Sequence, residues 1–147
     1  KPHRAKPAGK LSSFIRMTYY WVDYLIGMPY LLRKEVKAER YTIFDRYIFD
    51  FVVDPKRARI SLPYWMRKMF ARMVIQPQIV FVLNTEADVI YKRKQELELN
   101  EIKRQLDEFN KIESLCSNVV YIDAGQSVDE MTTQAIKIIF DKFLNKI

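Results

Sequence analysis

The sequence is poor in residues that build covalent or metal frameworks. Of its 147 residues one is a cysteine, Cys116, and one is a histidine, His3. A lone cysteine cannot close an internal disulfide and fits a reducing compartment. One cysteine and one histidine are too few for a zinc cluster. We therefore expect neither a disulfide scaffold nor a metal held by protein ligands alone.

Long apolar runs are also missing. No stretch approaches the roughly 18 consecutive apolar residues that span a membrane, and the N-terminus lacks the apolar region of a signal peptide. We expect a soluble, cytoplasmic protein that does not contact membranes. The sequence starts at Lys1 rather than at methionine, which we interpret as a processed, trimmed or partial chain.

The residues that are present suffice for one domain with a real core, since 49% are hydrophobic and 14% are aromatic. Their charge is uneven: residues 1–72 carry 16 Lys/Arg against 6 Asp/Glu, a net charge of +10, and residues 73–147 carry a net charge of −3. The basic half favours polyanions or phosphorylated small molecules as partners. Because no recognisable nucleic-acid-binding module accompanies it, nucleic acid is the less favoured partner.

Hydrophobic periodicity predicts helices alternating with strands. The prolines and glycine of residues 1–10 predict an extended arm, and a helix with a bend or break at Gly27-Met28-Pro29 should follow to about Lys37. We expect strands at Tyr41–Asp45, Ile79–Asn84 and Val119–Asp123, and helices at Leu62–Met73, Ala87 to about Glu113 (one helix or a pair) and Ser127 to about Leu144. Thr85 with Asp88, and Ser127 with Glu130, resemble capping boxes. Such alternation predicts an α/β fold with parallel strands in a single domain.

The segment Tyr41–Tyr47 carries the most functional information, because an apolar strand pattern ends there in an adjacent acid and base. Ligands of open parallel sheets bind beyond the carboxyl ends of the strands. Asp45 could therefore order a metal-bound water or accept a proton, and the planar guanidinium of Arg46 suits phosphate oxygens. A surface ion pair that merely ends the strand is the alternative.

The order of these motifs resembles the C-terminal two-thirds of a thymidylate kinase-like P-loop kinase, over roughly residues 40–147. It runs from Asp45-Arg46-Tyr47 through a basic loop, the strand IVFVLN, the run TEADVIYKR and a charged helical segment to VVYIDAGQSVDEM. Three further runs resemble a bacterial subgroup associated with cell-surface polysaccharide genes: YYWVDY from Tyr19, DPKRAR from Asp54 and RKQEL from Arg93. The resemblance implies a parallel-sheet, three-layer fold that is incomplete at its N-terminus here.

The resemblance also implies roles for single residues. Asp45 and Arg46 would be catalytic, with Arg46 on the acceptor phosphate. Arg57, Arg59 and Asp50 would complete the substrate site, and the donor-phosphate cations would lie in a lid region, residues 86–113, at Arg93, Lys94 and Arg104. ATP and Mg²⁺ would be the cofactors, and nucleotides the substrates. For Arg57 and Arg59 the alternative is solvated loop charge, for Lys94 and Arg104 solvated helix charge, and for Tyr19, Tyr20, Trp21 and Tyr24 helix packing rather than base stacking.

Two departures separate the sequence from that family. None of the glycines, Gly9, Gly27 and Gly125, belongs to a Gly-Lys-Ser/Thr phosphate-binding loop, so the donor cradle and its magnesium-ligating hydroxyl are missing. The usual base-pocket residues are also replaced, by Asp50 and by Val53-Asp54-Pro55, which leaves the nucleobase open. We expect a phosphotransferase from ATP to a phosphorylated acceptor such as dTMP, inactive as this chain alone. The alternatives are a polyanion- or nucleic-acid-binding module and a noncatalytic kinase remnant, and a homodimer is left open.

The family's strand order would place a further strand between Tyr41–Asp45 and Ile79–Asn84. Without that strand, unpaired backbone groups would line a gap. We expect partial collapse or aggregation of the chain alone. The alternatives are that the two flanking strands pair directly, or that another chain fills the gap.

Overall fold

The structure is a computed structural model that describes residues 8–93 and 97–143. It is a mostly helical α/β arrangement with a small parallel sheet. Its contacts divide it into two compact units, which we describe separately. The first unit runs to Gln76 and includes Ser114–Cys116, and the second comprises Pro77–Glu113 and the chain from Ser117 onward. Whether the whole chain forms one domain, as the sequence predicts, stays a prediction.

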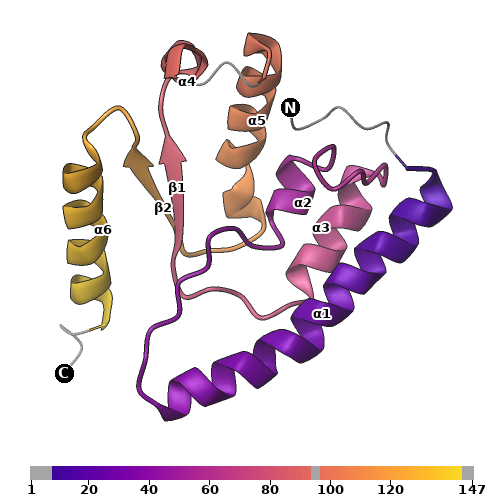
Figure 1. Cartoon of the computed structure of the whole chain (residues 1–147), viewed down its shortest axis with the longest axis horizontal. Helices are drawn as coiled ribbons and strands as arrows, with labels where there is room; N and C mark the ends of the chain where they lie inside the picture. The colour runs from indigo at the N-terminus through magenta and orange to yellow at the C-terminus, as the bar shows by residue number, and fades with distance from the viewer. Residues whose placement is uncertain (1–7, 94–96, 144–147) are drawn as a thin grey trace. The chain divides into compact units, whose positions relative to one another are not determined.

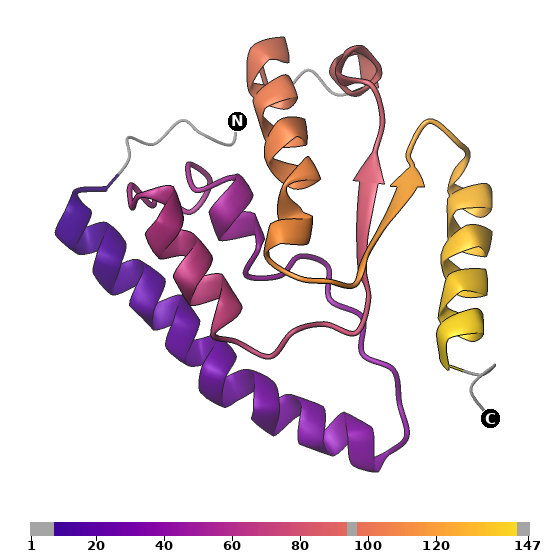
Figure 2. The same ribbon diagram turned by 180° about the vertical axis from the view of Figure 1, so that it is seen from behind.

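The first unit is built on α1 (Lys10–Lys37), with the short α2 (Asp50–Val53) and α3 (Tyr64–Arg72). Both α1 and α2 contact α3, and Figures 1 and 2 show α3 lying alongside α1. The predicted helix to Lys37 is confirmed, but the possible break at residues 27–29 does not occur, because α1 continues through Pro29. A proline removes only one backbone hydrogen bond from a helix of 28 residues.

The core of this unit lies between α1, α2 and α3. Met17 of α1 is fully buried, and the Trp21 ring meets Phe70 of α3 edge-on at 5.5 Å between ring centroids. Tyr20 stacks on Phe51 at 4.7 Å. This packing of Tyr20 and Trp21 agrees with the helix-packing alternative for the aromatic run of α1. The other buried apolar side chains here include Ile48, Phe49, Val52, Val53, Ile60, Leu62, Ala71 and Val74.

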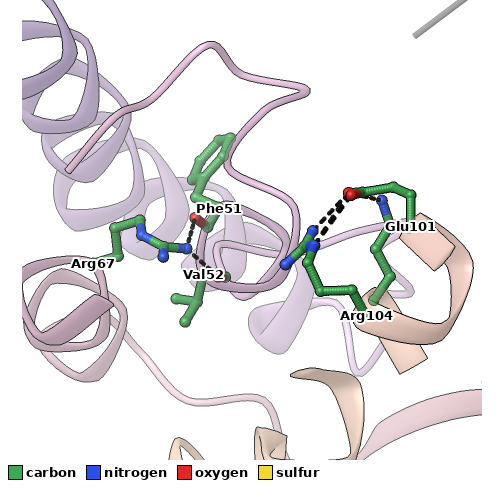
Figure 3. Close-up of polar contacts among 6 residues, drawn as sticks. Phe51, Val52, Arg67, Glu101 and Arg104 are labelled. Atoms are coloured by element: carbon green, nitrogen blue, oxygen red, sulfur yellow. Dashed lines mark hydrogen bonds and ion pairs between the residues drawn. The ribbon is translucent and has the colours of Figure 1, made fainter. Parts of the chain in front are cut away.

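Side chains pair some of the buried polar groups in the first unit, although Thr18 Oγ1 and Trp21 Nε1 are buried without a hydrogen-bond partner among the described residues. The hydroxyl of Ser13, which is fully buried, is 3.0 Å from the Ser61 hydroxyl, donates to Ala8 O at 3.1 Å and accepts from Ser61 N at 3.0 Å. Arg67 Nη1 donates to the carbonyl oxygens of Phe51 and Val52, two residues of α2 (Figure 3). Helix ends leave carbonyls without intrahelical partners, so Arg67 stabilises the end of α2.

The second unit contains β1 (Val80–Asn84), β2 (Val119–Asp123), α4 (Ala87–Arg93), α5 (Leu99–Asn110) and α6 (Val128–Phe143), and the short 3-10 turn η1 (Ile112–Ser114) precedes β2. The strands pair in parallel from Val80 with Val119 to Asn84 with Asp123. α4 contacts α5, and α6 contacts β2, beside which it lies in Figure 1. Both strands and their parallel direction agree with the sequence prediction. The region 87–113 contains a helix pair rather than one helix, in the part that the structure describes.

The capping box predicted at Ser127 is confirmed. Glu130 N donates to Ser127 Oγ at 3.3 Å, and Ser127 N donates to Glu130 Oε2 at 2.9 Å. Hydrogen bonds from Ser127 lower the pKa of the Glu130 carboxyl. Two free N–H groups at the start of α6 are thereby paired with side-chain oxygens.

The strand predicted at Tyr41–Asp45 is wrong, since this segment has no regular secondary structure. Ile43 is 87% exposed and Tyr41 is 65% exposed, so the segment is not buried either. β-branched and aromatic residues favour strands only where a neighbouring strand and a packed face accept them. Within the described residues the sheet holds β1 and β2 alone, so direct pairing of this segment with β1 is also absent.

In the described ranges, 8–93 and 97–143, no helix has the length and apolar character that a membrane span requires.

Burial of Met17 should contribute measurably to the stability of the first unit. Met17→Ala should lower the free energy of unfolding by about 2–5 kcal/mol, because a large buried side chain is replaced by a cavity. The matched control is Met69→Ala on α3, where the side chain is 44% exposed and the change should stay within about 0.5 kcal/mol. Urea denaturation followed by circular dichroism measures both. Equal effects of the two substitutions would contradict this packing.

Candidate functional site

Two of the predicted substrate residues meet at the start of α2, and a third acts on one of them through its charge. Arg46 Nη1 donates to Asp50 Oδ2 at 2.8 Å, and the charge of Arg57 also acts on Asp50. Arg46 adopts a left-handed backbone, with φ of 82°, just before the turn into α2. Non-glycine residues rarely adopt this conformation, and they do so mostly where surrounding contacts hold it. We call Arg46, Asp50, Arg57 and the neighbouring Tyr24 and Tyr47 the Asp50 cluster.

Burial sets the electrostatics of the Asp50 cluster. It raises the pKa of the Asp50 carboxyl, and the hydrogen bond and charge of Arg46 offset part of this effect. Burial likewise raises the pKa of Tyr24, and it raises the pKa of Tyr47 to about 12. Both phenols are therefore neutral donors near pH 7. Tyr47 uses its hydroxyl to donate to the carbonyl oxygen of Ile75.

Aromatic rings form one side of the Asp50 cluster. Tyr24 of α1 meets Tyr47 edge-on at 5.0 Å, and Phe49 lies 5.3 Å from Tyr47. Neither tyrosine was among the predicted site residues, although Tyr24 belongs to the aromatic run of α1. The available signal was the position of Tyr47 directly after Arg46, together with the four-residue spacing of Tyr20 and Tyr24 on one helix face.

Asp45 and Arg59, which were also predicted as site residues, are exposed. Asp45 is exposed, and it follows an irregular segment rather than a strand. Arg59 is exposed in the turn after Asp54-Pro55, with a left-handed φ of 56°, and its N–H donates to Lys56 O at 3.0 Å. The strand-end placement that supported Asp45 as a catalytic residue is therefore wrong.

A second candidate site lies in the second unit, where both parallel strands end. A cleft of about 700 Å³ is lined by residues that follow or belong to the ends of β1 and β2, with one residue of α4: Asn84, Thr85, Glu86, Val89, Tyr121, Ile122, Asp123 and Gly125. We call it the strand-end cleft. Its place at the carboxyl ends of neighbouring parallel strands is the usual place for ligands in open α/β sheets.

The loop after β2 is held in shape from two sides. Asp123 Oδ1 accepts from Gly125 N at 2.7 Å, and a Cβ at Gly125 would lie only 2.9 Å from the same oxygen. Arg93, at the end of α4, donates from Nη1 to Ala124 O at 2.6 Å. A side chain at position 125 would therefore displace the Asp123 carboxylate from its present position, and Arg93 binds loop carbonyls rather than presenting a free cation.

The chemistry of the strand-end cleft favours a ligand rich in hydrogen-bond donors. Its side chains include the carboxylates of Glu86 and Asp123, the amide of Asn84 and the hydroxyl of Thr85. Carboxylates accept hydrogen bonds and repel a phosphate placed beside them. In the described part of the chain no group of three or more His, Cys, Asp or Glu side chains is arranged to hold a metal ion. An amine-bearing heterocycle fits these groups better than an anion does.

The structure gives less support to the other two predicted lid residues, Arg104 and Lys94. Arg104 forms a bidentate pair with Glu101 on the same helix, α5, with 2.8 Å between Arg104 Nη2 and Glu101 Oε1 (Figure 3). This contact agrees with the alternative of a helix-surface charge. Lys94 lies outside the described residues. The lid region therefore brings one of its three predicted cations, Arg93, to the rim of a cleft.

The raised pKa of Asp50 predicts a pH dependence of stability. The folded protein binds this proton more tightly than the unfolded chain, so its contribution is fully present below about pH 3.8 and is lost as pH rises through the folded pKa. Asp50→Asn removes this loss. The free energy of unfolding of the variant minus that of the parent should therefore increase from pH 4 toward neutrality.

Urea denaturation at a series of pH values measures this difference. Arg46→Ala should have the opposite effect and make the loss steeper, because the guanidinium holds the pKa of Asp50 down. A difference between Asp50→Asn and the parent that does not change with pH would contradict the burial of a charged carboxylate.

Comparisons of the chain with protein-family models, curated proteins and solved structures found no match.

Proposed function

We propose that this chain is part of a nucleotide-dependent phosphotransferase of the thymidylate kinase-like type. Such an enzyme transfers a phosphoryl group from ATP to a phosphorylated acceptor such as dTMP. The observation that carries the proposal is the hydrogen bond from Arg46 to the partly buried carboxylate of Asp50, beside two neutral tyrosines, with the charge of Arg57 also acting on that carboxylate. The parallel pairing of β1 with β2 supports it, because the resemblance implies a three-layer, parallel-sheet fold that ends in two such strands.

The Asp50 cluster would bind the acceptor phosphate by exchange of partners. Asp50 accepts from Arg46 in the absence of a ligand, and the Arg46 side chain is about half exposed, so an incoming phosphate can reach the guanidinium. A dianionic phosphate offers more acceptor oxygens than one carboxylate and bonds a guanidinium fork in two places. Asp50 would thus hold Arg46 in position until the acceptor arrives, with Arg57 as the second cation.

The strand-end cleft would bind the heterocyclic part of a nucleotide. Glu86 and Asp123 supply acceptors for an exocyclic amine, and the side chain of Val89 supplies apolar contact. Arg93 would act as a positioning residue, since its bonds to the carbonyls of Ala124 and Gly125 fix the loop that forms one wall. This role replaces the direct contact with donor phosphates that the resemblance implies.

Catalysis itself needs more than these two sites. Phosphoryl transfer depends on alignment and on cations around the moving group, and Mg²⁺ bound to the nucleotide phosphates supplies part of that charge. This sequence contains no Gly-Lys-Ser/Thr loop to hold those phosphates. Asp45 is the residue that the resemblance assigns to the water shell of the metal, and its exposure leaves its carboxylate accessible.

The acceptor-site part of the proposal predicts a specific loss of affinity. Arg46→Ala should weaken dTMP binding by roughly 10- to 150-fold, the equivalent of about 1.5–3 kcal/mol for charge-assisted contacts. Arg46→Lys should recover part of this, because it retains the charge without the fork. Arg40→Ala is the matched control, since Arg40 is an exposed arginine whose ion pair with Glu35 is long, at 3.8 Å.

Isothermal titration calorimetry at fixed ionic strength measures these affinities. Arg46→Ala leaves the Asp50 carboxylate without its ion-pair partner. The double variant Arg46→Ala with Asp50→Asn removes this uncompensated charge and should therefore be measured as well. Unchanged dTMP affinity in both variants would refute the acceptor site. Equal losses for Arg46→Ala and Arg40→Ala would point instead to general polyanion binding by the basic half.

A further inference from the structure

A groove lies along the last third of α1, within the first unit. It has a volume of about 400 Å³, which is in the size range of small-molecule sites. It shares no lining residue with the Asp50 cluster or the strand-end cleft. The lining residues come from one side of α1 and from the chain after α3: Pro29, Leu32, Arg33, Val36, Lys37 and Ile75. We call this site the α1 groove.

The floor of the α1 groove is apolar. Pro29, Leu32 and Val36 are three and four residues apart, and this spacing places them on one face of the helix. Val36 is 68% exposed and Ile75 is 43% exposed, so much of this apolar surface is in contact with water. Covering it with the hydrocarbon part of a ligand is therefore favourable.

Two cations border the α1 groove. Arg33 and Lys37 are four residues apart, so they lie on the same side of the helix, and both are exposed. Neither forms an ion pair with another residue in the described ranges, and Glu35, which lies between them in the sequence, is 3.8 Å from Arg40 instead. Lys34 and Lys37, in the last turn, also offset the negative end of the helix dipole, which would otherwise repel an anion. Long basic side chains can cover apolar surface with their stems while their charged ends stay in water.

Hydrogen bonds hold the wall that Ile75 contributes. The hydroxyl of Tyr47 donates to the carbonyl oxygen of Ile75. On the next residue, Gln76 Nε2 donates to the carbonyl oxygens of Ala71 and Val74, both at 3.0 Å. Val74 itself is buried. The chain is thus fixed on both sides of Ile75, and a site that is formed in advance loses less free energy to ordering when a ligand binds.

We propose that the α1 groove binds a fatty acid, with the hydrocarbon chain on Pro29, Leu32 and Val36 and the carboxylate beside Arg33 and Lys37. The two parts of such a molecule match the two parts of the groove, because the chain leaves water and the carboxylate forms charge-assisted hydrogen bonds. A small anion such as acetate would gain nothing from the apolar floor. An acidic peptide is the less suitable occupant, since its backbone N–H and C=O groups would lie against apolar side chains without hydrogen-bond partners.

Fluorescence titration with dansyl-labelled undecanoate, below its critical micelle concentration, tests the proposal. Emission of the dansyl group rises when it leaves water, and the titration of the parent protein should saturate at a single site per chain. Decanoate should displace the labelled probe. Octanoate should do so with roughly 10-fold lower affinity, because two fewer methylene groups are buried. Acetate, which lacks the chain, and decyltrimethylammonium, which has the opposite charge, should not displace it.

Two pairs of variants locate the site. Lys37→Gln should weaken decanoate binding by roughly 10-fold, because a charge-assisted contact is lost. Lys34→Gln is its matched control, since Lys34 lies in the same last turn but does not line the groove. Val36→Gln places an amide in the apolar floor and should also weaken binding, and Val128→Gln is its control, because Val128 of α6 is similarly exposed, at 71%. Both control variants should bind decanoate as the parent does, and circular dichroism checks that all four are folded.

Three results would overturn the proposal. Equal losses of affinity in Lys37→Gln and Lys34→Gln would show that decanoate responds only to the general basic charge at the end of α1. Displacement that does not depend on chain length, including displacement by a Glu-rich peptide, would indicate an anion site without a place for hydrocarbon. Parent protein that binds anionic vesicles but shows no saturable binding of dissolved undecanoate would indicate contact with a membrane surface instead.

Discussion

The second unit depends on the parallel pairing of β1 with β2. Parallel neighbours must be joined by a crossover, and residues 85–118 make this connection through α4, α5 and η1. The same direction brings Asn84 and Asp123 to one edge of the sheet, where the loops before α4 and α6 begin. The strand-end cleft follows from this pairing, and the bond from Arg93 to Ala124 O joins the end of α4 to the loop after β2. A shifted register would separate these groups by at least one residue's rise, about 3.3 Å.

The Asp50 cluster rests on a different balance, between burial and charge. A carboxylate that is partly removed from water loses hydration, and one guanidinium at 2.8 Å returns only part of that free energy, so the pKa of Asp50 remains raised. Such incomplete compensation costs stability and is common where a ligand completes a site. An anion on Arg46 and Arg57 would release Asp50 from the pair. Asp50 could then take up a proton without leaving a charge unpaired.

The parts of the fold that could be predicted from sequence are those with continuous or periodic apolar patterns. β2 was expected at its observed bounds and β1 within one residue, and α1, α3 and α6 within about two, because the apolar pattern of each element is visible in its own stretch of sequence. Tyr41–Asp45 shows the limit of this reasoning, since its strand pattern needs a partner strand that periodicity cannot supply. Arg46 and Asp50, two of the residues named from the sequence, are hydrogen-bonded, yet they lie around the start of α2 rather than at the end of a strand. Tyr24 was assigned to packing because spacing alone does not reveal what a helix face contacts.

One edge of β1 has no partner strand among the described residues. Val80 N donates to Asn118 O and Ala124 N donates to Asn84 O, both at 2.8 Å, so the even-numbered residues of β1 face β2. The backbone N–H and C=O groups of Phe81 and Leu83 therefore point to the opposite edge, where no described strand pairs with them. Parallel sheets are rarely this small, because their strands need cover on both sides. A further strand beside β1 would meet this requirement. The proposed kinase-like sheet contains a strand at that position. In a completed sheet, the amide protons of Phe81 and Leu83 should be as well protected from hydrogen exchange as that of Val82. At an open edge, the amide protons of Phe81 and Leu83 should exchange rapidly.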